Sequence, residues 1–145
     1  MIRYFCLLGV VVFVLAACAT GSVLVPGNSN ECMVLPEHGY VADGTQVRIL
    51  HCHGAPNQQW NYANGQITGI GGSCLDVQGS APTEGARVIA VTCSGAPSQQ
   101  WNLSNGQVVG IGGKCLDVLE GNLFDRAPLI ISTCSGAPSQ QWAMH

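Results

Sequence analysis

Hydrophobic residues after position 20 form short runs that Gly, Pro, Asn and Ser residues separate. In the most regular stretch these runs cover residues 66–70, 74–77, 87–93 and 99–103. Apolar runs of this length between turn-forming residues are typical of β-strands. Because no stretch after position 20 keeps a helical period over three turns, the sequence predicts an all-β domain.

These runs belong to a unit that occurs three times in the chain. A Gln-x-Trp motif recurs at Trp60, Trp101 and Trp142, each 41 residues after the last, and Cys-x-Gly-Ala-Pro precedes every copy. The segment Gly-Ile-Gly-Gly-x-Cys-Leu-Asp-Val likewise occurs at residues 69–77 and 110–118. A period near 40 is typical of symmetric repeat folds.

Three units, at about residues 22–63, 64–104 and 105–145, make up the predicted domain. One unit cannot bury its own apolar strand faces, whereas three units closed about an axis cover these faces and leave few exposed strand edges. Four strands in each unit predict twelve strands, and the strict period of the tryptophans places them in the core. The first unit is less regular, because residues 32–34 read Cys-Met-Val where the others read Cys-Leu-Asp.

The first 18 residues have the pattern of an export signal. Arg3 is the positively charged start, and residues 5–17 form an apolar run. This run is shorter than the roughly 20 residues that a membrane-spanning helix needs. The sequence therefore predicts removal of a signal peptide and export from the cytoplasm.

Two cleavage sites fit the end of this signal. Leu-Ala-Ala-Cys at residues 15–18 matches the bacterial lipobox, which would make Cys18 the lipidated first residue of a cell-envelope lipoprotein facing outside the cytoplasm. Ala-Cys-Ala at residues 17–19 also fits ordinary signal peptidase, which would release a soluble protein that begins at Thr20. We expect the lipobox, and contact with a membrane through the lipid alone, because the Cys directly follows the apolar run.

Charge after residue 18 is sparse and acidic. All eight Asp and Glu residues and four of the five basic residues lie there, which gives a net charge of −4 with His neutral. Such a chain offers no basic stripe to a phosphate backbone, and we expect no nucleic-acid partner.

Six cysteines remain after the signal. An even number of cysteines in a small exported domain indicates disulfide bonds. The repeat places them in pairs within units, with separations of 20, 19 and 19 residues. The predicted bridges are Cys32–Cys52, Cys74–Cys93 and Cys115–Cys134.

Three Gln-x-Trp motifs, each preceded by a Cys-Leu-Asp-Val-like strand and a second Cys, resemble the ricin B-type lectin family of β-trefoils. The resemblance covers about residues 23–144 and implies a β-trefoil at residues 22–145 that binds glycans at up to three shallow sites. A site in that family uses the Asp after the first Cys, an aromatic residue two before the second Cys, and an Asn-Gln pair before the Trp. Asp, Asn and Gln bond sugar hydroxyls, while the aromatic ring stacks on the pyranose.

Carried over position by position, the resemblance implies a different set in each unit. The matching residues are Val34, Leu50, Asn57 and Gln58 in the first unit, Asp76, Val91, Ser98 and Gln99 in the second, and Asp117, Ser132, Ser139 and Gln140 in the third. No unit has the aromatic residue, but Phe124 in the loop 120–126 could replace it, or could pack on its own loop. We therefore expect the third site to bind best, with galactose-type or xylose-type sugars as ligands.

Two other functions are compatible with a fold of this kind. One is a β-trefoil that has lost sugar binding and serves as a protein-binding or structural surface. The other is an enzyme, but glycoside hydrolysis needs two carboxylates roughly 5–10 Å apart, and Asp76 and Asp117 belong to different units. We therefore expect no catalysis. The motif His51-Cys52-His53, with His38 nearby, lacks the paired cysteines of a structural zinc site, so we expect no metal. We also expect no cofactor.

Overall fold

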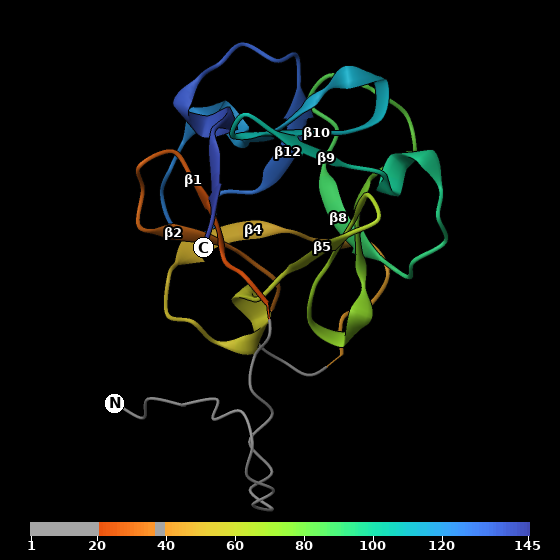
Figure 1. The fold of residues 1–145 in the computed structure, drawn as a ribbon, viewed down its shortest axis with the longest axis horizontal. Helices are drawn as coiled ribbons and strands as arrows, with labels where there is room; N and C mark the ends of the chain where they lie inside the picture. Colours follow the sequence, from red (N-terminus) through yellow and green to blue (C-terminus); the bar gives the residue numbers. More distant parts are fainter. Residues whose placement is uncertain (1–20, 37–39) are drawn as a thin grey trace, which may run out of the picture.

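The computed structural model of the protein describes residues 21–36 and 40–145 (Figure 1). The predicted signal peptide, Cys18 and the alternative first residue Thr20 lie outside these ranges, as does His38. Within the two ranges no helix is long and apolar enough to cross a membrane.

The described chain contains thirteen short strands. They are β1 (Leu24–Pro26), β2 (Glu31–Val34), β3 (Thr45–Gln46), β4 (Arg48–His51), β5 (Asn61–Ala63), β6 (Gln66–Thr68), β7 (Cys74–Val77), β8 (Val88–Val91), β9 (Asn102–Ser104), β10 (Gln107–Val109), β11 (Cys115–Val118), β12 (Leu129–Ser132) and β13 (Trp142–Met144). The two-residue strand β3 was not expected. The strand expected at residues 99–103 begins instead at Asn102, because Pro97–Gln99 forms a single 3₁₀ turn.

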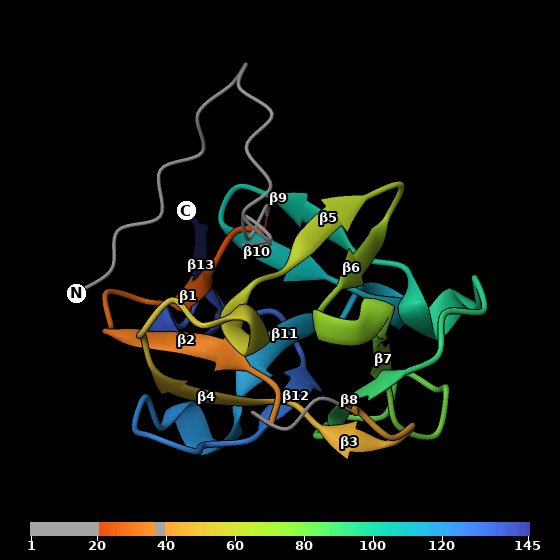
Figure 2. The same ribbon diagram turned by 90° about the horizontal axis from the view of Figure 1, so that it is seen from below.

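The strands form antiparallel pairs within units and between units. Within each unit β2 pairs with β4, β7 with β8, and β11 with β12. Between units β5 pairs with β6, β9 with β10, and β1 with β13, so the three units close into a ring around an axis (Figure 1). Figure 2 shows β5, β6, β9 and β10 toward one side of the molecule and β3, β8 and β12 toward the other. The predicted all-β, three-unit fold is confirmed, and it is a β-trefoil.

The three tryptophans lie in the core, as predicted. Each indole N–H donates a hydrogen bond to a carbonyl in its own unit, Trp60 to Met33, Trp101 to Leu75 and Trp142 to Leu116, at 2.9–3.0 Å. Gly110 packs against the ring of Trp101 so closely that a Cβ there would lie 2.6 Å from a ring carbon. The glycine that opens the Gly-Ile-Gly-Gly segment is therefore needed for the tryptophan to fit.

All three predicted disulfides are present, Cys32–Cys52, Cys74–Cys93 and Cys115–Cys134, and the described residues include no free cysteine. Each bridge lies within one unit and closes a loop of about 20 residues. In the chain-entropy account a loop of this length stabilises the fold by about 3 kcal/mol.

Neighbouring units are also joined by what we term the inter-unit clasps. In each clasp a loop carboxylate accepts a hydrogen bond from a backbone N–H just before the second Cys of the next unit. The pairs are Asp43 with Thr92, Glu84 with Thr133, and Asp125 with His51, at 2.7–3.0 Å. The residue after each carboxylate then donates its own N–H to the same strand, Gly44 to Ala90, Gly85 to Ile131 and Arg126 to Ile49. The clasps run from the first unit to the second, to the third, and back to the first.

Candidate functional site

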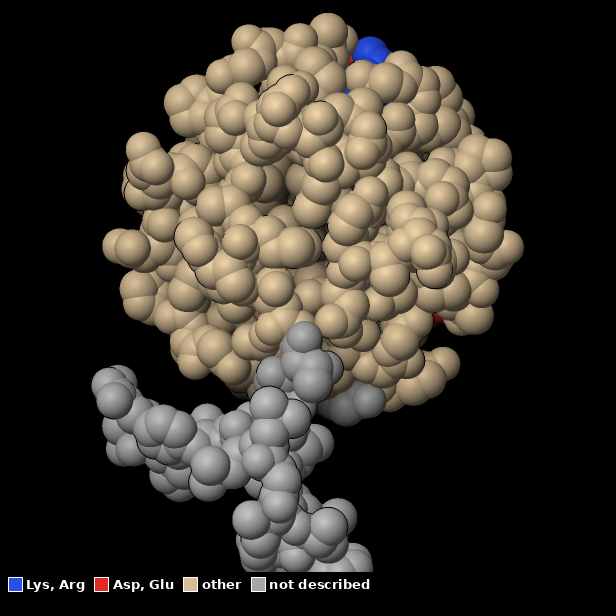
Figure 3. All heavy atoms as spheres, viewed as in Figure 1, with Lys and Arg blue, Asp and Glu red and all other residues tan. Residues whose placement is uncertain are grey.

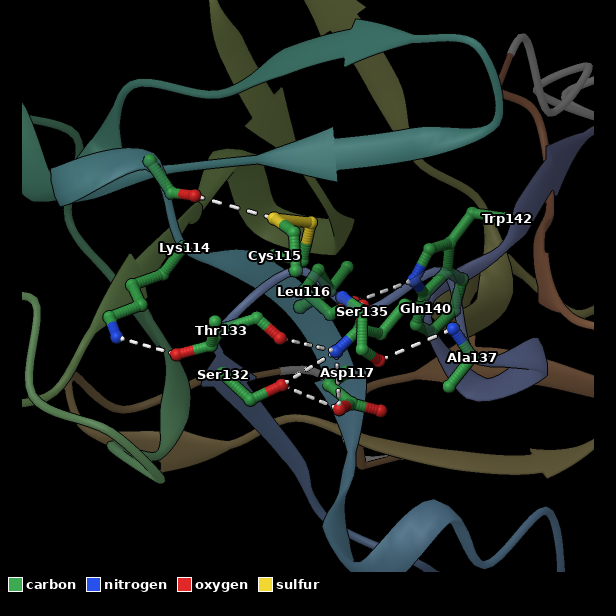
Figure 4. Close-up of a disulfide and its surroundings, with 12 residues drawn as sticks. Lys114, Cys115, Leu116, Asp117, Ser132, Thr133, Ser135, Ala137, Gln140 and Trp142 are labelled. Carbon is green, nitrogen blue, oxygen red and sulfur yellow. Dashed lines mark hydrogen bonds between the residues drawn. A yellow bond between two sulfur atoms is a disulfide. The ribbon is translucent and has the colours of Figure 1, made fainter.

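Each unit places its Gln against the strand that carries Asp76, Asp117 or, in the first unit, Val34. A proline begins the 3₁₀ turns Pro56–Gln58, Pro97–Gln99 and Pro138–Gln140, where its fixed φ suits the first turn of a helix. Each turn directs its last two side chains inward, and all six are buried. The structure therefore brings Asp76 together with Gln99, and Asp117 together with Gln140, as Figure 4 shows for the third unit.

In the third unit the carboxylate of Asp117 lies in a closed network. One oxygen accepts the N–H of Val118 at 2.7 Å, and the other accepts the Ser132 hydroxyl at 2.5 Å and the Gln140 amide at 3.0 Å. A carboxylate has about four acceptor positions, and three of them are used here. The Ser132 oxygen also accepts from the Gln140 amide, at 2.9 Å. Asp117 and Ser132 are only partly buried, so one acceptor position on each remains for a ligand.

The second unit repeats this network without the hydroxyl. Asp76 accepts the N–H of Val77 at 2.6 Å and the Gln99 amide at 3.1 Å, while Val91 stands where the third unit has Ser132. The carboxylate has more unused acceptor positions than Asp117, but only 7% of the Asp76 residue surface is exposed. A ligand would therefore reach Asp76 less easily than Asp117.

In the first unit the Gln makes its turn contacts without a carboxylate. Gln58 accepts the N–H of His53 at 2.8 Å and donates to the carbonyl of His51 at 3.0 Å. Asn57 is turned inward and donates to the carbonyl of Leu35 at 2.8 Å. Because these contacts form beside Val34, the Gln holds the turn whether or not its unit has an Asp.

The remaining predicted ligand residues form no hydrogen bond with these two carboxylates in the described chain. Ser98 and Ser139 are buried, and the Ser98 hydroxyl makes no hydrogen bond within the described chain. Phe124 is 75% exposed, and the next two residues of its loop, Asp125 and Arg126, bond to the first unit. The structure thus orients the end of this loop toward the first unit.

Sequence reasoning missed a hollow of about 520 Å³ in the first unit. It is bordered by β2, β4 and Arg126, and it lies beside Val34, where the family's carboxylate is absent. In the sequence this unit differs from the others by the missing Asp, which favoured the third unit as the best site. Pairing of the strands within the first unit would place Arg48 opposite Val34, but no sequence signal brings Arg126 to the same place.

The described side chains with shifted pKa values lie at the inter-unit clasps. Burial and a hydrogen bond with Asp125 raise the pKa of Glu31 to about 7, while the same hydrogen bond lowers the pKa of Asp125. A hydrogen bond from Lys114 lowers the pKa of Glu84 to about 2.

Few charged atoms are visible on the face that Figure 3 shows. No group of three His, Cys, Asp or Glu side chains in residues 21–36 and 40–145 is arranged to hold a metal ion.

Comparisons with known proteins agree on one architecture. Residues 20–142 match the ricin-type beta-trefoil lectin domain. The designed threefold symmetric protein ThreeFoil is 31% identical, with a TM-score of 0.75 over 85% of this chain and 96% of that one. The C-half of an earthworm R-type lectin, solved with GalNAc, is 15% identical, with a TM-score of 0.72 over 86% of this chain and 96% of that one.

A further similar structure is a non-toxic homologue of type II RIPs from Momordica charantia, solved with α-methyl-D-galactoside. It is 21% identical, with a TM-score of 0.71, and the match covers 85% of this chain and 46% of that one. At 15% and 21% identity, the earthworm and bitter gourd proteins show a shared fold and no more.

Proposed function

The chain belongs to the ricin-type β-trefoil lectin family, and from this we propose that it is an exported, lipid-anchored module that binds glycans weakly and without catalysis. The observation that carries the proposal is the Asp117–Ser132–Gln140 network of the third unit. It holds a partly exposed carboxylate and a hydroxyl side by side, in the arrangement that bonds to neighbouring sugar hydroxyls. Similar structures solved with GalNAc and α-methyl-D-galactoside make a galactose-type sugar the first candidate, with xylose-type sugars next.

The network also supports the proposal that binding is weak. Ser132 and Gln140 already occupy much of the Asp117 carboxylate, so a sugar gains few new hydrogen bonds there. Each contributes about 1 kcal/mol net, because water competes for the same groups. A dissociation constant near the millimolar range corresponds to about 4 kcal/mol, and useful affinity then requires several sites or molecules acting together.

Titration of galactose and xylose against point variants, followed by NMR, tests the proposal. Asp117→Asn keeps an oxygen that can accept the Val118 N–H but removes the charge, and we expect it to abolish most binding. Asp76→Asn should remove a smaller part, and Val34→Ala none. Melting curves check that each variant is folded. Unchanged sugar binding in folded Asp117→Asn would contradict the assignment.

The second candidate is a β-trefoil surface that binds a protein and no sugar. It is favoured by one observation, namely that Ser132 donates to Asp117 at the position where the family keeps its aromatic ring. This candidate would be supported over sugar binding if the wild-type protein bound no sugar on a glycan array and its NMR spectrum did not change on titration with galactose or xylose.

Export and lipid anchoring rest on the sequence of residues 1–18. Ser22 already bonds to the backbone of Trp60, so residues 19–21 alone would separate Cys18 from the folded domain. Such a tether would hold the domain close to the membrane, where many copies could act together. Mass spectrometry should find an acylated Cys18 at the N-terminus, and an unmodified N-terminus at Thr20 would show a soluble protein instead.

A further inference from the structure

The hollow of the first unit has two arginines at its edge. Arg48 reaches it from β4 of the first unit and Arg126 from the loop of the third unit, while Val34 and Leu50 form apolar parts of its wall. Arg48 and Arg126 are two of the four basic residues that follow the predicted signal. Half of these positive charges therefore meet at one depression of an acidic protein.

The position of Arg48 differs in charge from the equivalent position in the other two units. In the second and third units an Asp on the second strand lies opposite an Ile, Asp76 opposite Ile89 and Asp117 opposite Ile130. In the first unit Val34 lies opposite Arg48. Side chains directly opposite each other on antiparallel strands share one face of the sheet. The first unit thus offers a cation where the other two offer an anion.

Arg126 stands where the other units have glycine. Gly44, Gly85 and Arg126 follow the carboxylates of the three clasps and have φ values of 91°, 78° and 69°. This left-handed region suits glycine and is unfavourable for residues with a Cβ. The clasp holds Arg126 there through its N–H, which donates to Ile49 at 2.7 Å. The backbone gains nothing from an arginine at this position, which directs attention to its side chain.

The two guanidinium groups keep donors for a ligand. Arg48 donates through one Nη to the carbonyl of Arg126 at 2.9 Å, which links the two residues. A guanidinium has five donors, and its planar fork matches a carboxylate or a sulfate. Glu31 and Asp125 are the nearest described acids along these elements. They are hydrogen-bonded to each other, and Glu31 lies at the end of the β2–β4 pair opposite to Arg48. Asp125 directly precedes Arg126 and also interacts with its positive charge, so an anionic ligand must compete with this carboxylate for Arg126.

We propose that this hollow binds an anionic sugar, with the acidic group on Arg48 and Arg126 and the ring against Val34 and Leu50. The proposal rests on the proposed function in taking the ligand to be a carbohydrate. It assigns an anionic ligand to the first unit, which lacks the family's carboxylate, whereas the other two units are proposed to bind neutral sugars. Galacturonic acid and galactose 6-sulfate are suitable probes, because both carry an anion on the galactose framework.

The test is isothermal titration or NMR titration of the folded domain at low salt. Both acidic sugars, or one of them, should bind at least about tenfold more tightly than galactose. Arg126→Gly should weaken this binding by about tenfold and leave the melting temperature unchanged or higher, because Gly44 and Gly85 occupy the equivalent positions. Lys114→Gln removes the same charge outside the hollow and should change binding by less than about twofold.

Other outcomes overturn the proposal. Equal binding of galactose and galacturonic acid would remove the role of charge, and equal binding of acetate or inorganic sulfate would remove the role of the sugar. Loss of binding in Lys114→Gln as large as in Arg126→Gly would point to general electrostatics. Neutral-sugar binding that depends on Asp117 is read separately, so either site can fail while the other stands.

Discussion

Replacing Gln99 with alanine provides a direct test of how the Gln-x-Trp motif supports the fold. Gln99 is 1% exposed, and its amide joins three parts of the second unit. Its nitrogen donates to Asp76 and to the carbonyl of Thr92, both at 3.1 Å, and its oxygen accepts the N–H of Ser94 at 2.8 Å. Gln99→Ala removes all three hydrogen bonds at once.

The size of the effect follows from the groups that lose a partner. Each buried polar group left unpaired costs about 1–3 kcal/mol. The Thr92 carbonyl and the Ser94 N–H lie near the surface, where water replaces part of the loss. We therefore expect the free energy of unfolding to fall by about 3 kcal/mol, which lowers the melting temperature of a domain of this size by roughly 10 °C.

Urea unfolding followed by tryptophan fluorescence measures this change, and the next residue supplies the control. Gln100 has the same side chain but is exposed, so Gln100→Ala should change the free energy of unfolding by no more than about 0.5 kcal/mol. If the two variants unfold at the same urea concentration, the buried amide network does not hold the turn and the reasoning fails.

Three further outcomes are expected. Burial and the hydrogen bond to Asp125 raise the pKa of Glu31 from 4.5 to about 7, so the folded state binds this proton more tightly than the unfolded state. The melting temperature should therefore fall as the pH rises from 4.5 to 7. Calorimetry should find a smaller fall in Glu31→Gln. Reduction of the three disulfides should lower the melting temperature markedly, and scanning calorimetry with and without reductant measures the difference. Gly110→Ala should lower the urea midpoint, because its Cβ would lie 2.6 Å from the Trp101 ring, and a wild-type midpoint would contradict this packing.

The three-unit fold follows from the sequence because its strongest signals recur with one period. Trp60, Trp101 and Trp142 could share an environment only if the units were equivalent, and the cysteine pairs follow the same spacing. Strand boundaries were less predictable. Gln99 reads as part of an apolar run, yet its side chain bonds back to Ser94 and forms a turn. Apolar alternation carries no information on such side-chain contacts.

Side-chain contacts in the candidate sites were also only partly predictable from the sequence. The approach of Gln140 to Asp117 follows from the position of each in the repeat, but the bond from Ser132 depends on how strands β11 and β12 pair. The hollow beside Arg48 and Arg126 is further from prediction, because its two arginines come from the first and third units, which are far apart in the sequence. Only the closed arrangement of the units brings them together.

The inter-unit clasps have a consequence for the order of the chain. They pass from each unit to the next and from the last back to the first, and β1 pairs with β13 in the same way as β5 pairs with β6. A permuted chain, with the paired ends linked and the turn at Asn64–Gly65 opened, would keep every clasp and all its strand pairings. The folded protein is in this sense circular, because each unit bonds to both of its neighbours.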